Sequence, residues 1–149
     1  MNYCSYTLYY KHYSNAGFLN AGSIAAGGSC VEDTVGTVYK VGKSTDSAGE
    51  PVTPVQIEYS ADGFYDLSLI DCLHRVPNPH PDPNDPLVPD TVRTADTSGC
   101  AGHEHGLQLS VKGGRGFQCA PGTWCDDQAY LYEVSNKRKG VKTIILIGD

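Results

Sequence analysis

The sequence predicts an all-β domain, because three of its features favour short antiparallel strands. Glycine, proline and tyrosine are frequent, at 17, 9 and 10 residues in a chain of 149. Glycine and proline interrupt regular segments, whereas tyrosine and β-branched residues suit a pleated, half-buried surface. Roughly eight short segments lie between turn residues, and none has persuasive helical periodicity. We therefore expect one domain over residues 1–149, a sandwich or flattened barrel of about eight or more strands.

The first two expected strands form a hairpin. Residues 3–11 (YCSYTLYYK) alternate apolar with polar side chains, and residues 21–30 can return after a turn around Gly17. Cys4 and Cys30 lie symmetrically about Gly17. Because a hairpin places such positions opposite each other, we expect a disulfide between Cys4 and Cys30.

Six further strands are expected along the chain. Each lies between Gly, Pro, Asn or Asp residues and is rich in residues that favour strands. The segments are 34–41, 55–60, 64–70, 107–111, 129–134 and 141–147. Residues 76–90 (VPNPHPDPNDPLVPD) repeat proline, which cannot donate to a ladder, so this segment is expected to be an extended surface loop.

The cysteine pattern favours disulfides. Six cysteines occur without a CxxC pair, which argues against a zinc site and for an oxidising, extracellular compartment. Cys119 and Cys125 flank a short turn-forming loop, so we expect them to pair. With the hairpin disulfide formed, Cys72 and Cys100 remain and would clamp the proline-rich segment. Six cysteines allow many pairings, so spacing alone leaves other combinations open.

Charge and hydropathy exclude several classes of partner. With 11 basic and 17 acidic residues the net charge is -6, which disfavours nucleic acid and anionic membranes. No segment approaches the roughly 20 apolar residues that span a bilayer. No signal peptide is recognisable, so we interpret the chain as a mature secreted product whose leader has been removed. We expect a monomer without a cofactor.

The cluster His103-Glu104-His105 raises the question of a metal site. On a strand, His-x-His would place both imidazoles on one face, as some metal sites require. Nothing in the sequence brings His74 or His80 to this pair. A loop that exposes polar residues is the simpler interpretation, and we expect no metal.

Four stretches, in family order, resemble the thaumatin-like proteins. Residues 2–10 (NYCSYTLYY) are similar to the family's opening strand, and residues 17–30 (GFLNAGSIAAGGSC) to its turn and small-residue strand. Residues 57–71 (IEYSADGFYDLSLID) resemble its most specific segment, and residues 99–102 (GCAG) its GCxG motif. The matches span about two thirds of the chain.

The resemblance implies a secreted, disulfide-stabilised β-sandwich of the compact type found in plants and fungi, and we expect a fungal protein. Members of the family act in host–microbe encounters, as antifungal proteins or as factors that plants perceive. The resemblance therefore implies an effector or elicitor of plant defence at a host or cell-wall surface. An antifungal protein is an alternative. Another is an interaction protein whose proline-rich segment and tyrosine-rich face bind a host surface protein.

The resemblance also implies an acidic cleft. The family's cleft, associated with binding or slow cleavage of β-1,3-glucan, contains one Arg, one Glu and three Asp. Glu58, Asp66 and Asp71 match the Glu and two of the Asp. Gln108 stands at the third Asp, and Glu50 lies where the Arg is expected. Because the Arg and one Asp are missing, we favour non-enzymatic binding of β-glucan over catalysis.

The alternative is a weak endo-β-1,3-glucanase with Glu58 as general acid and Asp66 or Asp71 as the second carboxylate. Strand alternation turns Glu58 away from the core. Asp66 and Asp71 lie an odd number of residues apart, so they share a face only if the chain bends near Asp71. For binding, carboxylates accept hydrogen bonds from sugar hydroxyls, and aromatic rings stack on sugars. The other candidate contacts are Tyr59, Phe64, Tyr65, Gln108 and Trp124.

Overall fold

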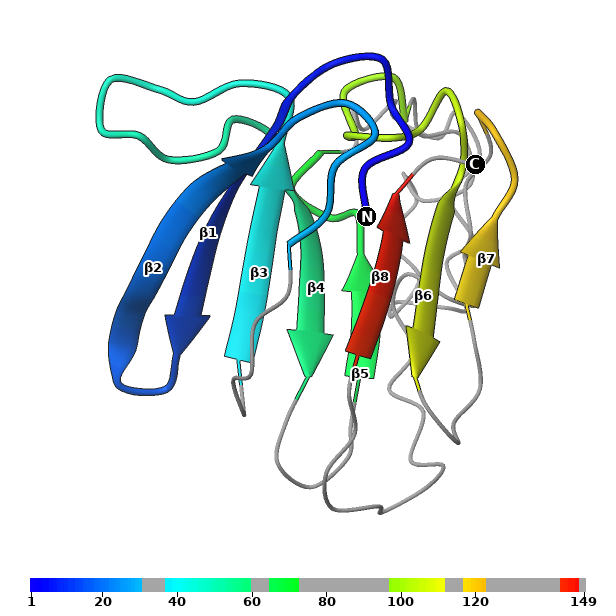
Figure 1. The fold of residues 1–149 in the computed structure, drawn as a ribbon. Coiled ribbons are helices and arrows are strands. Elements are labelled where there is room, and N and C mark those ends of the chain that lie inside the picture. Colours follow the sequence, from blue (N-terminus) through cyan, green and yellow to red (C-terminus); the bar gives the residue numbers. More distant parts are fainter. Residues whose placement is uncertain (31–36, 60–64, 73–96, 112–116, 123–142, 148–149) are drawn as a thin grey trace, which may run out of the picture.

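Two antiparallel sheets make up the described part of the chain, as the sequence predicts (Figure 1). The computed structural model describes residues 1–30, 37–59, 65–72, 97–111, 117–122 and 143–147. The larger sheet has the strand order β2-β1-β3-β4-β5, and the smaller sheet has the order β7-β6-β8. No helix among these residues is long and apolar enough to cross a membrane.

The strands are short, and most lie where the alternation of the sequence places them. The larger sheet contains β1 (Leu8–Ser14), β2 (Gly17–Ile24), β3 (Thr37–Gly42), β4 (Val55–Tyr59) and β5 (Tyr65–Ser68). The smaller sheet contains β6 (Leu107–Val111), β7 (Phe117–Cys119) and β8 (Thr143–Ile147). Strand β7 was not predicted from the sequence, because its three residues are too few for a recognisable alternation. The expected strand at 129–134 and the proline-rich segment 76–90 lie outside the described residues.

The predicted hairpin forms, but its strands begin at different residues. Its first strand was expected from residue 3 and starts at Leu8, because Asn2 holds the preceding segment in another conformation. The Asn2 side chain accepts a 2.9 Å hydrogen bond from the Cys4 amide and donates to the carbonyls of Tyr6 and Ile24. Side-chain bonds of this kind satisfy backbone groups that would otherwise need a ladder. The second strand begins at Gly17 and ends at Ile24.

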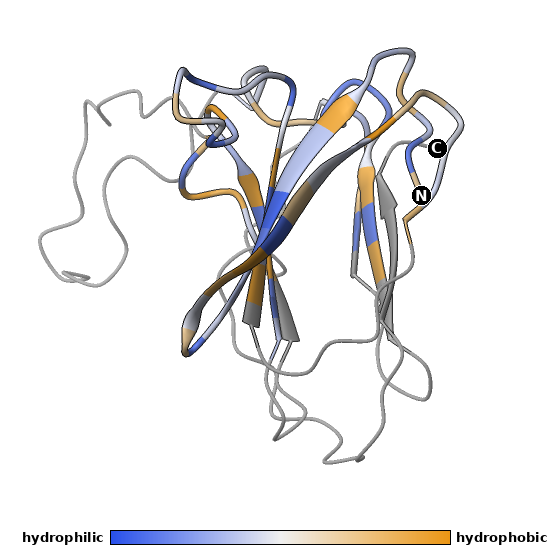
Figure 2. Cartoon of the chain, turned by 60° about the vertical axis from the view of Figure 1, so that its left-hand side comes forward, coloured by the Kyte–Doolittle hydropathy of each residue, from blue (hydrophilic) through white to orange (hydrophobic). Residues whose placement is uncertain are grey.

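The core lies between the two sheets, which Figure 2 shows as separate layers facing each other. Alternate residues of the strands enter it, and the largest fully buried apolar side chains include Leu8 on β1, Ile57 on β4 and Leu109 on β6. Burying such a side chain contributes about 1.5–3 kcal/mol. The residues that alternate with these buried ones along each strand of the larger sheet therefore point away from the core.

Disulfides attach the segments around β5, β6 and β7. Cys72 and Cys100 form the expected bond, with Cα atoms 4.9 Å apart, and it links the turn after β5 to the segment before β6. Cys119 is also disulfide-bonded, and Cys125, its predicted partner, lies outside the described residues. The sequence expectation of a disulfide-stabilised β domain is thus confirmed.

The predicted disulfide between Cys4 and Cys30 is wrong. Cys4 is buried in the core, whereas the Cys30 thiol is exposed and lies 3.4 Å from the Tyr10 hydroxyl. The hairpin ladder starts only at Leu8, so its register does not extend back to Cys4. Counting symmetrically about the turn could not reveal that the two cysteines leave the ladder in different directions.

Candidate functional site

The candidate site lies on the side of the larger sheet that points away from the smaller sheet, which we call the outer face. Strand alternation places Lys11 of β1, Lys40 of β3 and both Gln56 and Glu58 of β4 there. These side chains are half-buried, whereas their neighbours on β4, Val55 and Ile57, are buried. The opposite side of the sheet, which packs against the core, is the inner face.

Glu58 and Asp66 occupy opposed positions on the outer face. They are cross-strand partners in the antiparallel pairing of β4 with β5. Directly opposed positions share one side of a sheet, with Cβ atoms typically about 4.5–5.5 Å apart. The structure thus brings together the positions of two acids that the sequence analysis assigned to one site.

Asp71 also lies on the outer face. Because it is an odd number of residues from Asp66, the chain must bend between the two for them to share a face. β5 ends at Ser68, and a turn closed by a 3.0 Å hydrogen bond from the Cys72 amide to the Leu69 carbonyl follows. The turn brings the Asp71 carboxylate to the Gln56 amide, which donates a 2.8 Å hydrogen bond to it. Since Gln56 and Glu58 lie two residues apart on one strand, they share a face, and Asp71 lies on it with them.

Lys40 supplies a positive charge that the sequence analysis did not identify. Its Nζ lies 3.6 Å from the Asp71 carboxylate, with both side chains more than a third exposed. Lys40 and Gln56 are cross-strand partners in the pairing of β3 with β4. The alternation of β3 could have revealed Lys40, but only once β3 was known to lie beside β4.

Glu50, expected where the family has an arginine, forms an ion pair with Lys11. Their charged atoms are 2.5 Å apart, and the Tyr13 hydroxyl donates a 2.7 Å hydrogen bond to the other carboxylate oxygen. The pKa of Glu50 is lowered, first by the bond from Lys11 and then by the bond from Tyr13, and nearby Lys40 acts in the same direction. The acceptor Glu50 raises the pKa of Tyr13 to about 12. Negative charge at position 50 is therefore balanced by cations of the outer face.

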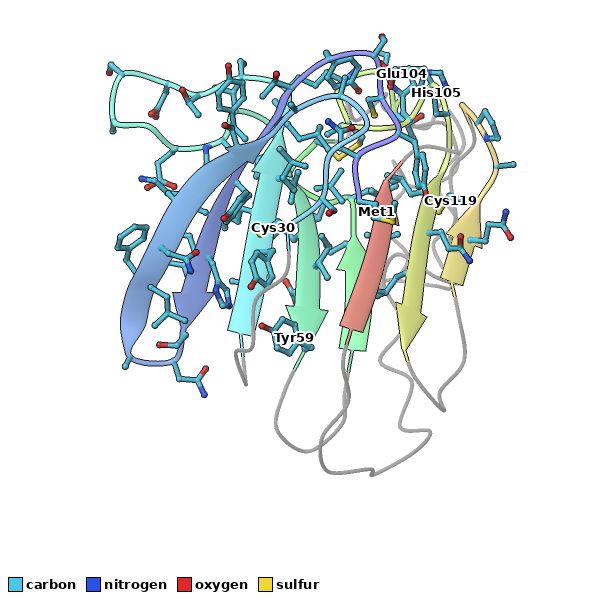
Figure 3. All side chains as sticks on the ribbon, in the orientation of Figure 1. Met1, Cys30, Tyr59, Glu104, His105 and Cys119 are labelled. Atoms are coloured by element: carbon cyan, nitrogen blue, oxygen red, sulfur yellow. A yellow bond between two sulfur atoms is a disulfide. The ribbon has the colours of Figure 1, made fainter. Side chains whose placement is uncertain are left out.

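Two aromatic residues proposed as ligand contacts do not lie with the acids. Tyr59 projects from the inner face of β4, where its ring stacks on Tyr39 at 6.1 Å and its hydroxyl lies 3.2 Å from His12 Nε2 (Figure 3). The sequence assignment of Tyr59 to the site is wrong, because it shares the parity of Ile57 rather than Glu58. Tyr65 is the cross-strand partner of Tyr59, so its position also belongs to the inner face. The other two candidates, residues 64 and 124, lie outside the described residues.

Gln108 does not join the acids either. It lies on β6 between Leu107 and Leu109, which are both buried in the core. Alternation turns Gln108 away from that core, on the far side of the smaller sheet. The prediction that Gln108 contributes to the acidic site is therefore wrong.

The His103-Glu104-His105 cluster lies in a turn rather than on a strand, so the geometry required for a paired imidazole site is not present. The Glu104 carboxylate is 2.9 Å from His103 Nδ1 and accepts a 3.0 Å hydrogen bond from Lys43. Figure 3 shows Glu104 and His105 at one end of the sandwich. The described residues contain no group of three or more side chains arranged to hold a metal ion.

The outer face combines hydrogen-bond acceptors and donors in contact with solvent. The Asp71 carboxylate is 40% exposed and keeps oxygen atoms available for further bonds, because a carboxylate has about four acceptor positions. Lys40 and Gln56 supply donors beside it. Such a mixture suits a ligand with many hydroxyl groups, which both donate and accept hydrogen bonds.

Comparison with known proteins identifies a solved structure with a similar fold. No family model matches the chain, and no curated protein matches it. Among solved structures, the chain is similar to the crystal structure of the protein elicitor MoHrip2 from Magnaporthe oryzae, with 19% sequence identity and a TM-score of 0.51. The similarity covers 97% of this chain and 87% of that chain. The chain thus shares its all-β fold with a fungal protein elicitor.

Proposed function

We propose that the chain is a small thaumatin-like protein, secreted by a fungus, that acts as an elicitor or effector of plant defence. In this proposal it binds β-1,3-glucan on its outer face without cleaving it. The observation that carries the proposal is the meeting of Glu58, Asp71 and the position of Asp66 on one solvent-facing side of the larger sheet. The fold shared with a protein elicitor supports the biological role.

An extracellular location agrees with the chemistry of the cysteines. The Cys72–Cys100 bond and the disulfide at Cys119 persist in oxidising compartments and are rare in the cytosol. The Cys72–Cys100 bond links the turn after β5 to the segment before β6. Disulfides of this kind are common in small secreted domains, which agrees with action at a cell wall or host surface.

Binding fits the outer face better than efficient catalysis. Asp71 is engaged by Gln56 and by Lys40, so its carboxylate is positioned as an acceptor beside a cation. A glycosidase also needs a carboxyl group that stays protonated to release the leaving oxygen. The contacts of Asp71 supply no such proton donor, because Gln56 donates to its carboxylate and Lys40 pairs with it as a cation.

The second candidate is a weak endo-β-1,3-glucanase, which the register of Glu58 with Asp66 favours. Retaining glycosidases place their two carboxyl groups about 5–5.5 Å apart, close to the Cβ separation typical of directly opposed residues. In this reaction Glu58 would protonate the leaving oxygen, and Asp66 would attack the sugar. Release of reducing ends from soluble β-1,3-glucan, abolished in Glu58→Gln, would identify this activity.

The elicitor role is tested by applying the purified protein to leaf tissue and measuring the oxidative burst. We expect a dose-dependent burst from the wild type and a weaker one from the triple variant Glu58→Gln/Asp66→Asn/Asp71→Asn. Circular dichroism verifies that the variant is folded. A wild type that produces no burst at any dose would contradict the elicitor role. An undiminished burst from the folded triple variant would show that the outer-face acids do not contribute to it.

A further inference from the structure

The tip of the β1–β2 hairpin carries an exposed aromatic ring at the end of the outer face. Phe18 is 59% exposed, the largest value among the exposed hydrophobic residues of the described chain. It is the cross-strand partner of Tyr13, so it shares the face of Tyr13 and Lys11. Because this ring remains in contact with water, it adds nothing to the hydrophobic core.

Contacts on the outer face hold this ring in one place. The Tyr13 ring meets Phe18 edge-on, with centroids 6.0 Å apart and an interplanar angle of 72°. The Lys11 ammonium lies 5.6 Å from the Phe18 centroid. Lys11 and Tyr13 are in turn both bonded to Glu50. Phe18 is therefore an exposed ring with pre-organised neighbours, which reduces the entropy lost when a ligand stacks on it.

The ring is continuous with the acidic part of the outer face. Lys11 and Lys40 are cross-strand partners, and so are Lys40 and Gln56, so one row of side chains crosses β1, β3 and β4. With strands spaced about 4.8 Å apart, the five strands of the sheet span roughly 19 Å. At one end of the row Lys40 lies beside Asp71. At the other end Lys11 pairs with Ala21 of β2, and its ammonium lies over the Phe18 ring further along that strand.

We propose that Phe18, with Tyr13 and the Lys11–Glu50 pair, forms a second sugar-binding subsite, which stacks on a glucosyl unit of a β-1,3-glucan chain. This inference rests on the proposed binding of β-glucan by the outer-face acids and extends it to the length of glucan that the protein recognises. A pyranose ring offers an apolar C–H surface to an aromatic ring and hydroxyl groups at its edge. Phe18 provides the apolar contact, and Lys11, Glu50 and the Tyr13 hydroxyl provide polar partners around it. A glucan chain across the sheet would touch both ends of the row.

The polar surroundings favour a sugar over a protein pocket as the occupant. Energetically important residues of protein interfaces cluster in well-packed centres shielded from water. Phe18 instead lies at the margin of the sheet, beside a lysine, a glutamate and a tyrosine hydroxyl. Its apolar neighbour Leu19 falls at the β-bulge where the β1–β2 register shifts, outside the paired row.

The test is isothermal titration calorimetry with two β-1,3-linked glucose oligosaccharides, one shorter and one longer than the row. Five proteins are compared: wild type, Phe18→Ala, Phe18→Tyr, Leu19→Ala and Glu58→Gln. We expect Phe18→Ala to weaken binding of the long oligosaccharide about threefold to tenfold, which corresponds to the stabilisation an aromatic contact provides, while Leu19→Ala remains within about twofold of wild type. Phe18→Tyr, which keeps the ring, should bind like the wild type. Glu58→Gln should weaken binding of both lengths.

The outcomes separate this inference from the function on which it rests. If Phe18→Ala binds the long oligosaccharide as tightly as the wild type while Glu58→Gln binds it more weakly, the subsite is wrong and glucan binding stands. If the wild type binds neither oligosaccharide, glucan binding itself is wrong, and the subsite with it. If Phe18→Ala reduces the leaf response without changing either affinity, the ring contacts a protein and the sugar subsite is overturned.

Discussion

Gln56 donates a 2.8 Å hydrogen bond to the carboxylate of Asp71, fifteen residues further along the chain. This bond joins the turn after β5 to the outer face of β4 and places Asp71 on the side where Glu58 and Asp66 are paired. Without it, only the ion pair with Lys40 would tie Asp71 to the outer face. The arrangement of the proposed glucan site therefore depends on this contact.

The energetic coupling of Gln56 and Asp71 can be measured with a double-mutant cycle. We expect Gln56→Ala and Asp71→Ala each to lower the free energy of unfolding, and the double variant to lower it by about 0.5–1 kcal/mol less than the sum. The value is small because both groups are partly exposed. Urea denaturation of the four proteins provides the energies. Strict additivity would show that the hydrogen bond does not hold the turn in solution.

The lowered pKa of Glu104 predicts that its contribution to the stability of the fold depends on pH. Burial opposes its ionisation, but bonds from its own backbone amide, Lys43 and Tyr6 outweigh that effect and leave its pKa below the usual 4.5. A lowered pKa in the folded state contributes stability that is complete above the unfolded value and is lost as the pH falls through the folded value. Thermal unfolding of wild type and Glu104→Gln should therefore show a Tm gap that is widest near neutral pH and closes as the medium is acidified below about pH 4.5. A gap that persists or widens in acid contradicts this reasoning.

The two cysteines outside the disulfides should react differently with a chromogenic thiol reagent. Cys30 is exposed, whereas Cys4 is buried, and burial raises the pKa of the Cys4 thiol. Since the thiolate is the reactive form, Cys30 should react quickly in the native protein and Cys4 only after unfolding. The absorbance then corresponds to one thiol in buffer and two in denaturant. No reactive thiol in denaturant would instead support a disulfide between them.

Two glycines with positive φ allow strain to be separated from a steric clash. Gly49 and Gly106 have φ values of 74° and 88°, but a Cβ at Gly49 would meet nothing within 4 Å, whereas one at Gly106 would lie 2.6 Å from the Cys119 carbonyl oxygen. Gly49→Ala should cost about 1 kcal/mol, the penalty for an L-residue in this conformation. Gly106→Ala should cost about 1–3 kcal/mol more, because backbone must move. Equal losses in chemical denaturation would mean that the close approach is absent in solution.

Local alternation made much of the fold predictable. The period of two in residues 55–60 placed Glu58 opposite to the core, and the odd spacing of Asp66 and Asp71 showed that a shared site needs a bend. The turn at Leu69–Cys72 supplies it. The same alternation could have excluded Tyr59 and Gln108, since each belongs to a face that does not carry Glu58.

Contacts between distant segments were not predictable from periodicity. The position of Lys40 beside Asp71 depends on the strand order β3-β4-β5, which no local pattern encodes. The wrong prediction of a disulfide between Cys4 and Cys30 also arose from a contact between distant segments. The buried Asn2 side chain donates to the Ile24 carbonyl and so ends the hairpin ladder before it reaches Cys4. Side chains that replace backbone pairing leave little trace in the hydrophobic pattern of a sequence.

The most direct test of the account is co-sedimentation with insoluble β-1,3-glucan. The comparison includes wild type, Glu58→Gln, Asp71→Asn and, as a control away from the outer face, Glu104→Gln. We predict that wild type and Glu104→Gln pellet with the glucan, and that the two outer-face variants bind at least about threefold more weakly, as expected for loss of a charged hydrogen-bond partner. A wild type that stays in the supernatant, or outer-face variants that pellet as well as the wild type, would contradict a glucan-binding function for this face.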